Sequence, residues 1–559
     1  MLPHQYSQRE QILNHKKDGL NGHYPMSMQN RLGEIKSAVV GGSFPTLLLI
    51  CLCVYSLLFL FLGWATFSED DAHVMRVAVD SSWTNPYLDG EMYKQLSAAN
   101  YTPVVLTVYH LILTLLPLSS MSFLFVTLLT ISLFTALVGS LVRHIATSVE
   151  AGWLAMFLVF SNLSLSSLVT RFYTIHYMVG GIFALLCLIV AIRKSYQSLP
   201  LLLCGLLLLL SMLSKEVYLA MPLIVLLIAW KDKSPKLAAT ALLSWLIYFV
   251  MRTLVLGFNS DGRSASGLIA SLASVNIDTW MDFLYWYVKH HGVILLALLV
   301  TAFRTPIVTA KYLAISLLFV APTLAAAHGF TNPLLHGDRL FFAFNSASAI
   351  VVALSLHQLL KDRGLVVGRV LLVSLAVLFG LHALVISQYK AREVIRADYR
   401  ITQYLLDPSN DATSKTFFVP LTFAQGDLRL VQETLYGESF KATQNCRDAL
   451  AVPESTLVVF DNAGEITSRI QLEKNCQPAN PNVNVIIPPR AIAGVVEWKF
   501  EISDNFRGGV LFVDRAFAAP VTSYRTLILN PRPGERYQLF ATKDEQWWFS
   551  DIQEIVIRD

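Results

Sequence analysis

The chain has 559 residues, of which 54% are hydrophobic and 15% charged, and its mean hydropathy is +0.52. This apolar share exceeds that of ordinary soluble domains and predicts a membrane protein. The net charge of +4 is spread over the whole length, and there is no basic stripe with interleaved aromatic residues, so we expect no nucleic-acid partner.

The N-terminal segment 1–43 is polar and has no short apolar core followed by a cleavage site. The first apolar run begins at Phe44 and lasts about 24 residues, enough to cross a hydrocarbon core of roughly 30 Å. The sequence therefore predicts a cytoplasmic tail followed by an uncleaved first membrane span.

Further apolar runs predict about eleven spans in total. These runs lie at 120–142, 151–169, 175–192, 199–213, 217–230, 238–256, 291–303, 310–327, 339–357 and 367–387. Segment 100–117 is also apolar, but it is short and bounded by prolines, which favours a helix on the outer membrane surface. The predicted fold is an α-helical polytopic membrane domain at 44–388, with a first external loop at 68–119.

Basic residues recur in alternate loops, so the positive-inside rule gives one consistent orientation. The N-terminus is expected in the cytoplasm, and residues 389–559 are expected on the outside. This tail contains strand-like runs such as "STLVVFDN" and turn-rich pieces such as "NPRPGE", which predict a β-rich α+β domain. Its two cysteines, Cys446 and Cys476, are predicted to form a disulfide because that side is oxidising.

Three successive carboxylates, Glu69, Asp70 and Asp71, follow the first span on its outer side. Charged residues at the end of a span often only mark the membrane interface. Like charges this close, however, raise each other's proton affinity, which suits a group that removes a proton from a hydroxyl at neutral pH. We therefore predict a functional site in this loop.

Other charged residues are expected at the same outer level of the membrane. Each alone could be an interfacial anchor or part of a local ion pair. Taken together, the cations suit a lipid-linked phosphate whose apolar tail lies between helices. The cations are Arg76, Arg171, Lys215 and Arg339, and His176, Glu216 and Asp338 are candidate supporting residues.

Four stretches resemble the GT-C superfamily, the polytopic glycosyltransferases that use polyprenyl-phosphate sugars, such as protein O-mannosyltransferases and lipid A aminoarabinose transferases. These stretches are "EDDAHVMR" after the first span, "YTPVVLTVYHL", "SKEVYLAMPLIVLL" and "GDRLFFAFNSASAI". They are short and lie within residues 44–360.

The resemblance implies an inverting transfer of a sugar from a polyprenyl-phosphate donor to a glycan or lipid acceptor at the cell surface. Asp70 or Asp71 would act as the general base, and Lys215 and Arg339 would bind the donor phosphate. Some members of the superfamily bind a divalent metal such as Mg²⁺ or Mn²⁺ near the acidic pair and others do not, so metal dependence stays open.

Two other functions remain as alternatives. A polymerase or ligase of lipid-linked polysaccharide would also present external arginines, but it would not need an acidic pair after the first span. A secondary transporter would carry ionisable groups near the membrane midplane, whereas these charges gather at one face. From its general character we expect the protein in a bacterial inner membrane, with the C-terminal domain in the periplasm.

Overall fold

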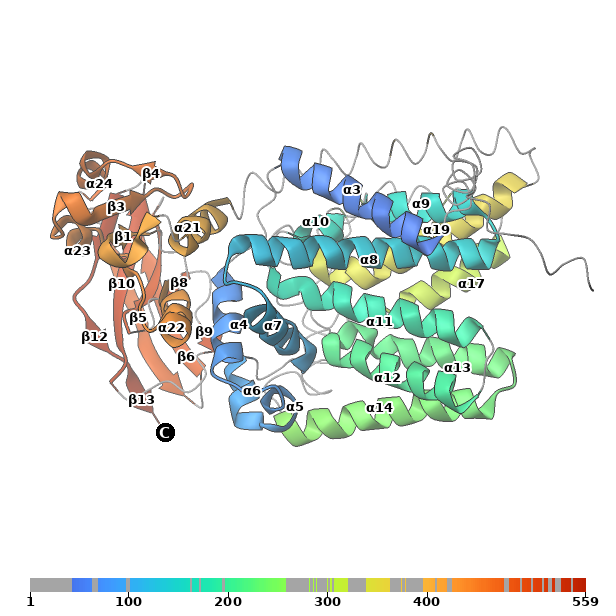
Figure 1. The fold of residues 1–559 in the computed structure, drawn as a ribbon. Helices are drawn as coiled ribbons and strands as arrows, with labels where there is room; N and C mark the ends of the chain where they lie inside the picture. The colour runs from blue at the N-terminus through green and yellow to red at the C-terminus, as the bar shows by residue number, and fades with distance from the viewer. Residues whose placement is uncertain are drawn as a thin grey trace, which may run out of the picture.

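The computed structural model describes most of the chain from residue 43 onward (Figure 1). For some residues, including Glu69, Asp70 and Asp338, it describes the backbone only. The continuous described ranges are 43–62, 69–96, 101–160, 163–169, 172–193, 197–257, 306–319, 338–361, 396–407, 410–419, 425–476, 482–492, 495–503, 506–514, 517–520, 525–527, 534–543 and 546–558.

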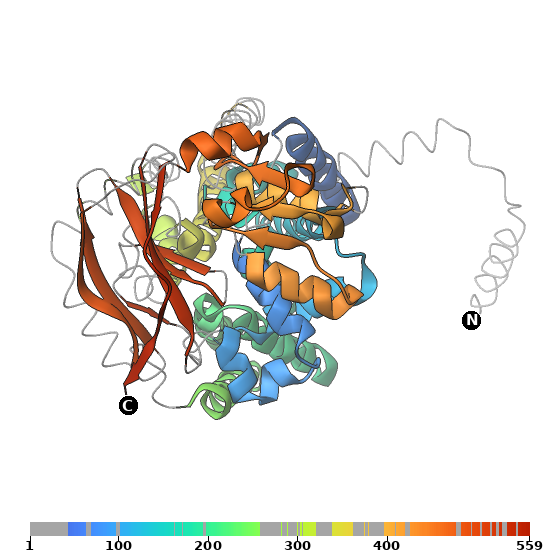
Figure 2. The same ribbon diagram turned by 90° about the vertical axis from the view of Figure 1, so that its left-hand side faces the viewer.

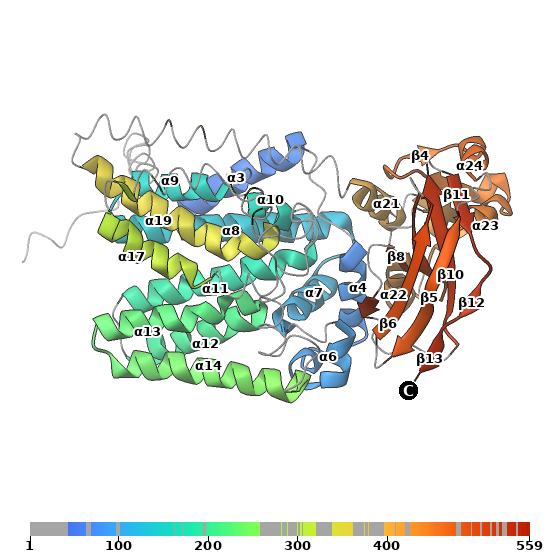
Figure 3. The same cartoon turned by 180° about the vertical axis from the view of Figure 1, so that it is seen from behind.

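The first part of the chain is helical. Its helices are α3 (Phe44–Leu62), α4 (Glu69–Val79), α5 (Asn85–Leu88), α6 (Gly90–Leu96), α7 (Pro103–Leu115), α8 (Ser120–Ala146), α9 (Val149–Phe160), α10 (Leu163–Val169), α11 (Ile175–Ile192), α12 (Ser198–Ser214), α13 (Met221–Lys231), α14 (Pro235–Leu256), α17 (Pro306–Leu317) and α19 (Phe342–Lys361). Among the described residues, three 3₁₀ turns connect them: η1 (Phe172–Thr174), η2 (Glu216–Ala220) and η4 (Asp338–Phe341). The long helices lie side by side, and Figure 3 shows α19 running along α8 and α9.

Three of the described helical segments are long and apolar enough to cross a membrane: Ser120–Ala146, Phe172–Ile192 and Pro235–Leu256. Five further apolar helices in this part are shorter than a full span, and α7 is one of them. Residues 1–42 lie outside the described residues, as does almost all of the predicted spans 291–303 and 367–387. The described residues therefore support a membrane protein, whereas the number of eleven spans stays a prediction.

Helix α14 shows why a lipid environment suits this bundle. Its start is defined by Ser234, whose hydroxyl accepts from the Leu237 backbone N–H at 3.3 Å, and by Pro235 in the first turn. One face carries large apolar side chains that remain exposed, among them Leu246 at 60% and Leu254 at 79%. A contiguous apolar surface of this kind is costly in water and stable in lipid.

Small residues allow the helices to approach closely. A Cβ atom at Gly180 on α11 would lie 2.6 Å from the ring of Tyr218, and one at Gly181 would lie 2.6 Å from the ring of Phe134. The Tyr218 hydroxyl donates to the backbone carbonyl of Tyr177 at 2.5 Å. The glycines therefore hold η2 against the start of α11, as small residues commonly do between membrane helices.

The C-terminal region has two layers of different construction. The first contains β1 (Thr416–Phe418), β2 (Lys441–Thr443), β3 (Leu457–Phe460) and β4 (Ile466–Thr467), with α21 (Arg396–Leu406), α22 (Gln425–Tyr436), α23 (Cys446–Leu450), α24 (Arg469–Asn475) and the turns η6 (Ala412–Ser414) and η7 (Glu454–Thr456). Its strand order is β2-β1-β3-β4, and β1 pairs in parallel with β2 and β3. Helices therefore connect parallel strands, as in other α/β units.

The second layer is a β-sandwich, visible at the left of Figure 2. Its strands are β5 (Val483–Ile492), β6 (Val495–Ile502), β7 (Arg507–Phe512), β8 (Phe517–Pro520), β9 (Arg525–Leu527), β10 (Arg536–Lys543), β11 (Gln546–Phe549), β12 (Gln553–Glu554) and β13 (Val556–Arg558). One sheet has the order β11-β10-β7-β8, with β12 beside β10, and the other has the order β13-β5-β6-β9. Trp498, Phe512 and Tyr537 from both sheets share one buried core.

A disulfide and a shared core stabilise this region. Cys446 and Cys476 are joined by a disulfide with a Cα–Cα distance of 5.9 Å, which links α23 to the end of α24. Leu405 and Leu428 belong to the same apolar cluster as the helices of the first part of the chain. The α/β layer is therefore packed directly against the helical bundle, at the end where α4 and α7 lie (Figure 1).

Candidate functional site

The carboxylate of Asp71 lies at the start of α4 and is completely buried, with 0% exposure. Its Oδ1 accepts a hydrogen bond of 2.6 Å from the hydroxyl of Tyr109 on α7. Carboxylates in the first turn of a helix are stabilised by the helix dipole, which favours an acidic run at this position. Because a buried charge needs hydrogen-bond donors, Tyr109 both stabilises and orients this carboxylate.

Aromatic contacts connect this carboxylate to the second external link of the predicted topology. The ring of Tyr109 lies edge-to-face on Phe172 of η1, with a centroid distance of 5.2 Å. Phe123 of α8 packs edge-to-face on Phe172 at 4.8 Å. Helix α4 also packs against η1, so residues far apart in the sequence meet at one end of the bundle.

Tyr173, which follows Phe172 in η1, brings two basic side chains together. Its hydroxyl accepts a hydrogen bond from Nη1 of Arg339, and its ring centre lies 5.3 Å from the guanidinium carbon. Its backbone carbonyl is 2.6 Å from Nδ1 of His176. A carbonyl only accepts hydrogen bonds, so Nδ1 must carry the proton, and in the neutral ring Nε2 is then an acceptor. Within the described part of the chain, this buried Nε2 has no hydrogen-bond partner.

Lys215 lies beside the same group. Its Nζ is 5.1 Å from the ring centre of Tyr177, and that ring stacks on the ring of His176 at 4.9 Å. The ammonium also lies 3.6 Å from a carboxylate oxygen of Glu216. The structure thus brings together Lys215, His176 and Arg339, which come from three separate connections of the chain.

Glu216 has a positioning role in the structure. Its other carboxylate oxygen accepts from the backbone N–H of Tyr101 at 2.5 Å and so ties η2 to the segment before α7. The hydroxyl of Tyr93 accepts from the backbone N–H of Thr102 at 2.5 Å. Burial raises the pKa of the Tyr93 and Tyr101 hydroxyls, so both stay protonated at neutral pH. These contacts fix the start of the helix that carries Tyr109.

The remaining residues predicted for the site either lie in other contacts or have side chains that the structure does not describe. Arg76 forms an i,i+4 ion pair with Asp80 at 3.8 Å on α4, partly exposed to solvent. Arg171 lies outside the described residues. Glu69 and Asp70 begin α4 and Asp338 begins η4, but their side chains are not among those the structure describes.

The acidic run raises the question of a divalent metal. Among the described side chains, no three His, Cys, Asp or Glu residues form a group that could hold a metal ion. At this site the described carboxylates are Asp71, bound by Tyr109, and Glu216, bound by the Tyr101 backbone. These two carboxylates do not make up a metal site.

The C-terminal domain takes part in the surroundings of α4. Helix α22 packs against α4, and Figures 1 and 2 both show the two helices next to each other. Leu428 and Val431 on α22 are fully buried. The helix that begins with the acidic run is therefore held between the bundle and the C-terminal domain.

Sequence reasoning missed three aromatic residues of this site. Tyr109, Tyr173 and Tyr177 orient Asp71, Arg339 and Lys215, respectively. The sequence marked these tyrosines as site residues only by their position: Tyr109 lies in the "YTPVVLTVYHL" stretch, and the other two lie on either side of His176. Tyrosine inside an apolar run usually indicates core packing, so position alone was a weak signal.

The arrangement combines a buried, oriented carboxylate with cations at one end of apolar helices. Carboxylates can accept a proton from a hydroxyl, and cations can hold a phosphate, so the chemistry suits group transfer from a phosphate-bearing donor. No protein-family model matches the chain, and no curated protein was found that resembles it.

Proposed function

We propose that this protein is an inverting glycosyltransferase of the GT-C type. It would transfer a sugar from a polyprenyl-phosphate donor to a cell-surface glycan or lipid. The observation that carries the proposal is the joining of two groups through η1 and the start of α11. The Asp71–Tyr109 pair lies on one side, and Arg339, His176 and Lys215 lie on the other.

In the proposed reaction, the acceptor hydroxyl attacks the anomeric carbon of the donor sugar while the bond from that carbon to the phosphate oxygen breaks. The proton of the hydroxyl passes to the carboxylate of Asp70 or Asp71. The pair of electrons of the broken bond stays on the polyprenyl phosphate, and Lys215 and Arg339 stabilise the resulting charge. A single direct displacement inverts the anomeric configuration.

His176 suits the donor side of this site. Its Nε2 is a buried hydrogen-bond acceptor beside two cations, so it can accept from a hydroxyl of the donor sugar. The exposed leucine face of α14 supports contact with lipid, which a polyprenyl tail requires. We also propose the topology and the location: about eleven spans in a bacterial inner membrane, an N-terminus in the cytoplasm, and the C-terminal domain in the periplasm.

The proposal is tested with membranes that contain the native protein and polyprenyl-phosphate sugars labelled in the sugar. We expect labelled sugar to pass to the acceptor while an equal amount of polyprenyl phosphate is formed. Arg339→Gln and Lys215→Gln should raise KM for the donor. Arg143 lies in the last turn of α8, on the cytoplasmic side in the proposed topology and so away from the site. Arg143→Gln should therefore leave KM for the donor unchanged.

Other outcomes would identify the alternatives. Label that remains on lipid in progressively longer chains would identify a polymerase, and label that crosses sealed vesicles unchanged would identify a transporter. If no labelled lipid is consumed by the native protein, the transferase proposal is wrong.

A further inference from the structure

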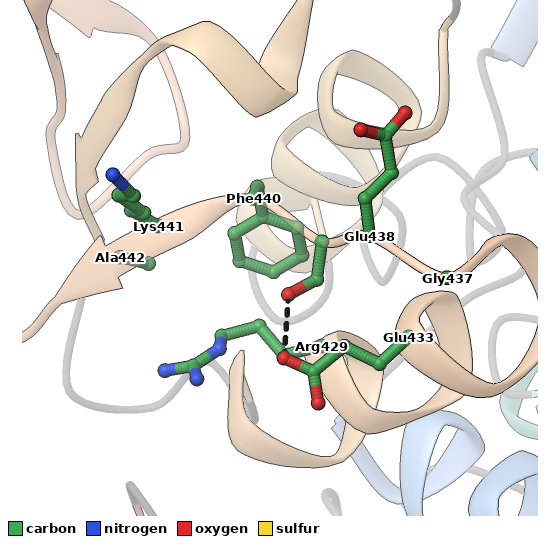
Figure 4. Close-up of a pocket in the computed structure, with 8 residues that line it drawn as sticks. Arg429, Glu433, Gly437, Glu438, Phe440, Lys441 and Ala442 are labelled. Atoms are coloured by element: carbon green, nitrogen blue, oxygen red, sulfur yellow. Dashed lines mark hydrogen bonds between the residues drawn. The ribbon is translucent and has the colours of Figure 1, made fainter.

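A surface pocket of about 450 Å³ lies in the α/β layer of the C-terminal region. It is formed by the second half of α22 and the segment that leads into β2 (Figure 4). The residues that line it are Arg429, Glu433, Gly437, Glu438, Ser439, Phe440, Lys441 and Ala442. Its volume is in the range that holds a small ligand or a few units of a chain.

The pocket contains a cation with one buried hydrogen-bond donor that is not used. Nε of Arg429 is buried, and in the described part of the chain it has no hydrogen-bond partner. Lys441, from the start of β2, is exposed and adds a second positive charge. In Figure 4 the Arg429 guanidinium and the Lys441 ammonium lie on the same side of the pocket.

The two acidic residues of the pocket differ in their placement. The carboxylate of Glu433 accepts from the Ser439 hydroxyl at 3.0 Å, and the Glu438 side chain extends away from the two cations (Figure 4). The cationic side can therefore hold an anion, while the carboxylates and the serine can bond to hydroxyl groups beside it. This mixture of one anion site and several hydroxyl sites matches an acidic sugar.

The pocket lies beside a helix that packs against α4. Arg429 and Glu433 lie on α22, the helix that packs against α4. A helix with its side chains is about 10 Å across, so a chain bound in the pocket lies within roughly that distance of α4. An extended glycan can bridge such a distance between a binding pocket and the reacting hydroxyl.

We propose that this pocket binds an acidic sugar of the acceptor glycan through its carboxylate or phosphate group. This inference rests on the proposed transferase function, from which it takes the presence of an acceptor. The C-terminal domain would then select acceptors that carry negative charge and place them over the bundle.

Binding is tested without turnover, using the full-length protein in lipid nanodiscs and isothermal titration. The probe is tetragalacturonate, with the uncharged maltotetraose as a control of equal length and inorganic phosphate as the simplest anion. We expect tetragalacturonate to bind the native protein and Asp71→Asn equally, and maltotetraose to bind at least tenfold more weakly. If phosphate alone binds and tetragalacturonate does not, the pocket is an inorganic anion site and the glycan proposal is wrong.

Variants then assign the binding to the pocket. Arg429→Gln and Lys441→Gln should each weaken tetragalacturonate binding at least tenfold, whereas Lys474→Gln on α24, an exposed lysine of the same domain, should have no effect. Lys441 is exposed, so its variant tests the proposal even if Arg429→Gln does not fold. Equal weakening by Lys474→Gln, or unchanged binding by both pocket variants, would overturn the inference. Because no sugar is transferred in this assay, its failure is distinct from failure of the transferase proposal.

Discussion

Replacing Tyr109 with phenylalanine would remove a hydroxyl that donates to the buried Asp71 carboxylate at 2.6 Å. The ring and its contacts with Phe172 and Phe123 would remain, so the change is confined to the hydrogen bond. A hydrogen bond to a charged group contributes about 1.5–3 kcal/mol, and Asp71 has no exposure to water that could replace it. We therefore expect the free energy of unfolding to fall by an amount in this range.

The same loss should appear in turnover if the carboxylate acts in the reaction. Each 1.36 kcal/mol corresponds to a tenfold change in rate, so kcat should fall roughly 10- to 100-fold. Unfolding can be followed by denaturant titration in detergent micelles, with the exposed Tyr436→Phe on α22 as a control that should change neither quantity.

A double-mutant cycle with Asp71→Asn decides whether the effect passes through the carboxylate. We expect Tyr109→Phe to cost clearly less stability in the Asp71→Asn background, with a coupling of about 1 kcal/mol or more. If the two substitutions are additive, the bond between Tyr109 and Asp71 does not stabilise the protein, which would contradict this prediction.

Three further predictions concern the frame around the site. Replacing Cys446 and Cys476 by serine opens a loop with a sequence separation of 30 residues and should cost about 3–4 kcal/mol; dithiothreitol should lower the melting temperature of the native protein but not of this variant. Gly180→Ala places a Cβ atom 2.6 Å from the Tyr218 ring and should lower the melting temperature through a cost of about 1–3 kcal/mol; an unchanged value would contradict the close packing of η2 on α11. Hydrogen bonds from the Arg536 side chain hold the pKa of Asp514 below its usual range. Their contribution to the free energy of unfolding is therefore present above about pH 4 and is lost as pH falls through the folded-state pKa. In an acid titration, Asp514→Asn should be slightly less stable than the native protein near neutral pH and equally stable at the acid end; the difference should be small because the pair is largely exposed.

The sequence predicted helix positions well where apolar runs had clear ends. It predicted a span starting at Phe44 and a break around Lys215 and Glu216, and in the structure α3 begins at Phe44 and α12 ends at Ser214. These features depend on local hydropathy and on charges that interrupt it. The number of spans depends also on residues that the structure does not describe.

The C-terminal region was predicted as β-rich, but its parallel α/β layer was not foreseen. Strands β1 and β2 have three residues each, too few to show a periodic pattern. The packing of α22 on α4 joins segments more than 300 residues apart in the printed sequence, and no local pattern encodes such a contact. For the same reason the sequence indicated charged residues on several loops but not the tyrosines that connect them.

In the proposed function, the carboxylates at the start of α4 activate the acceptor. The most direct measurement is sugar release from labelled polyprenyl-phosphate donors by Asp70→Asn and Asp71→Asn, at matched expression and with the fold verified. Asp80→Asn makes the same chemical change at the other end of this helix and serves as the control. We expect at least one of the first two variants to lose turnover by several orders of magnitude while Asp80→Asn keeps it. Native-like turnover by both Asp70→Asn and Asp71→Asn would contradict the role of these carboxylates as the general base.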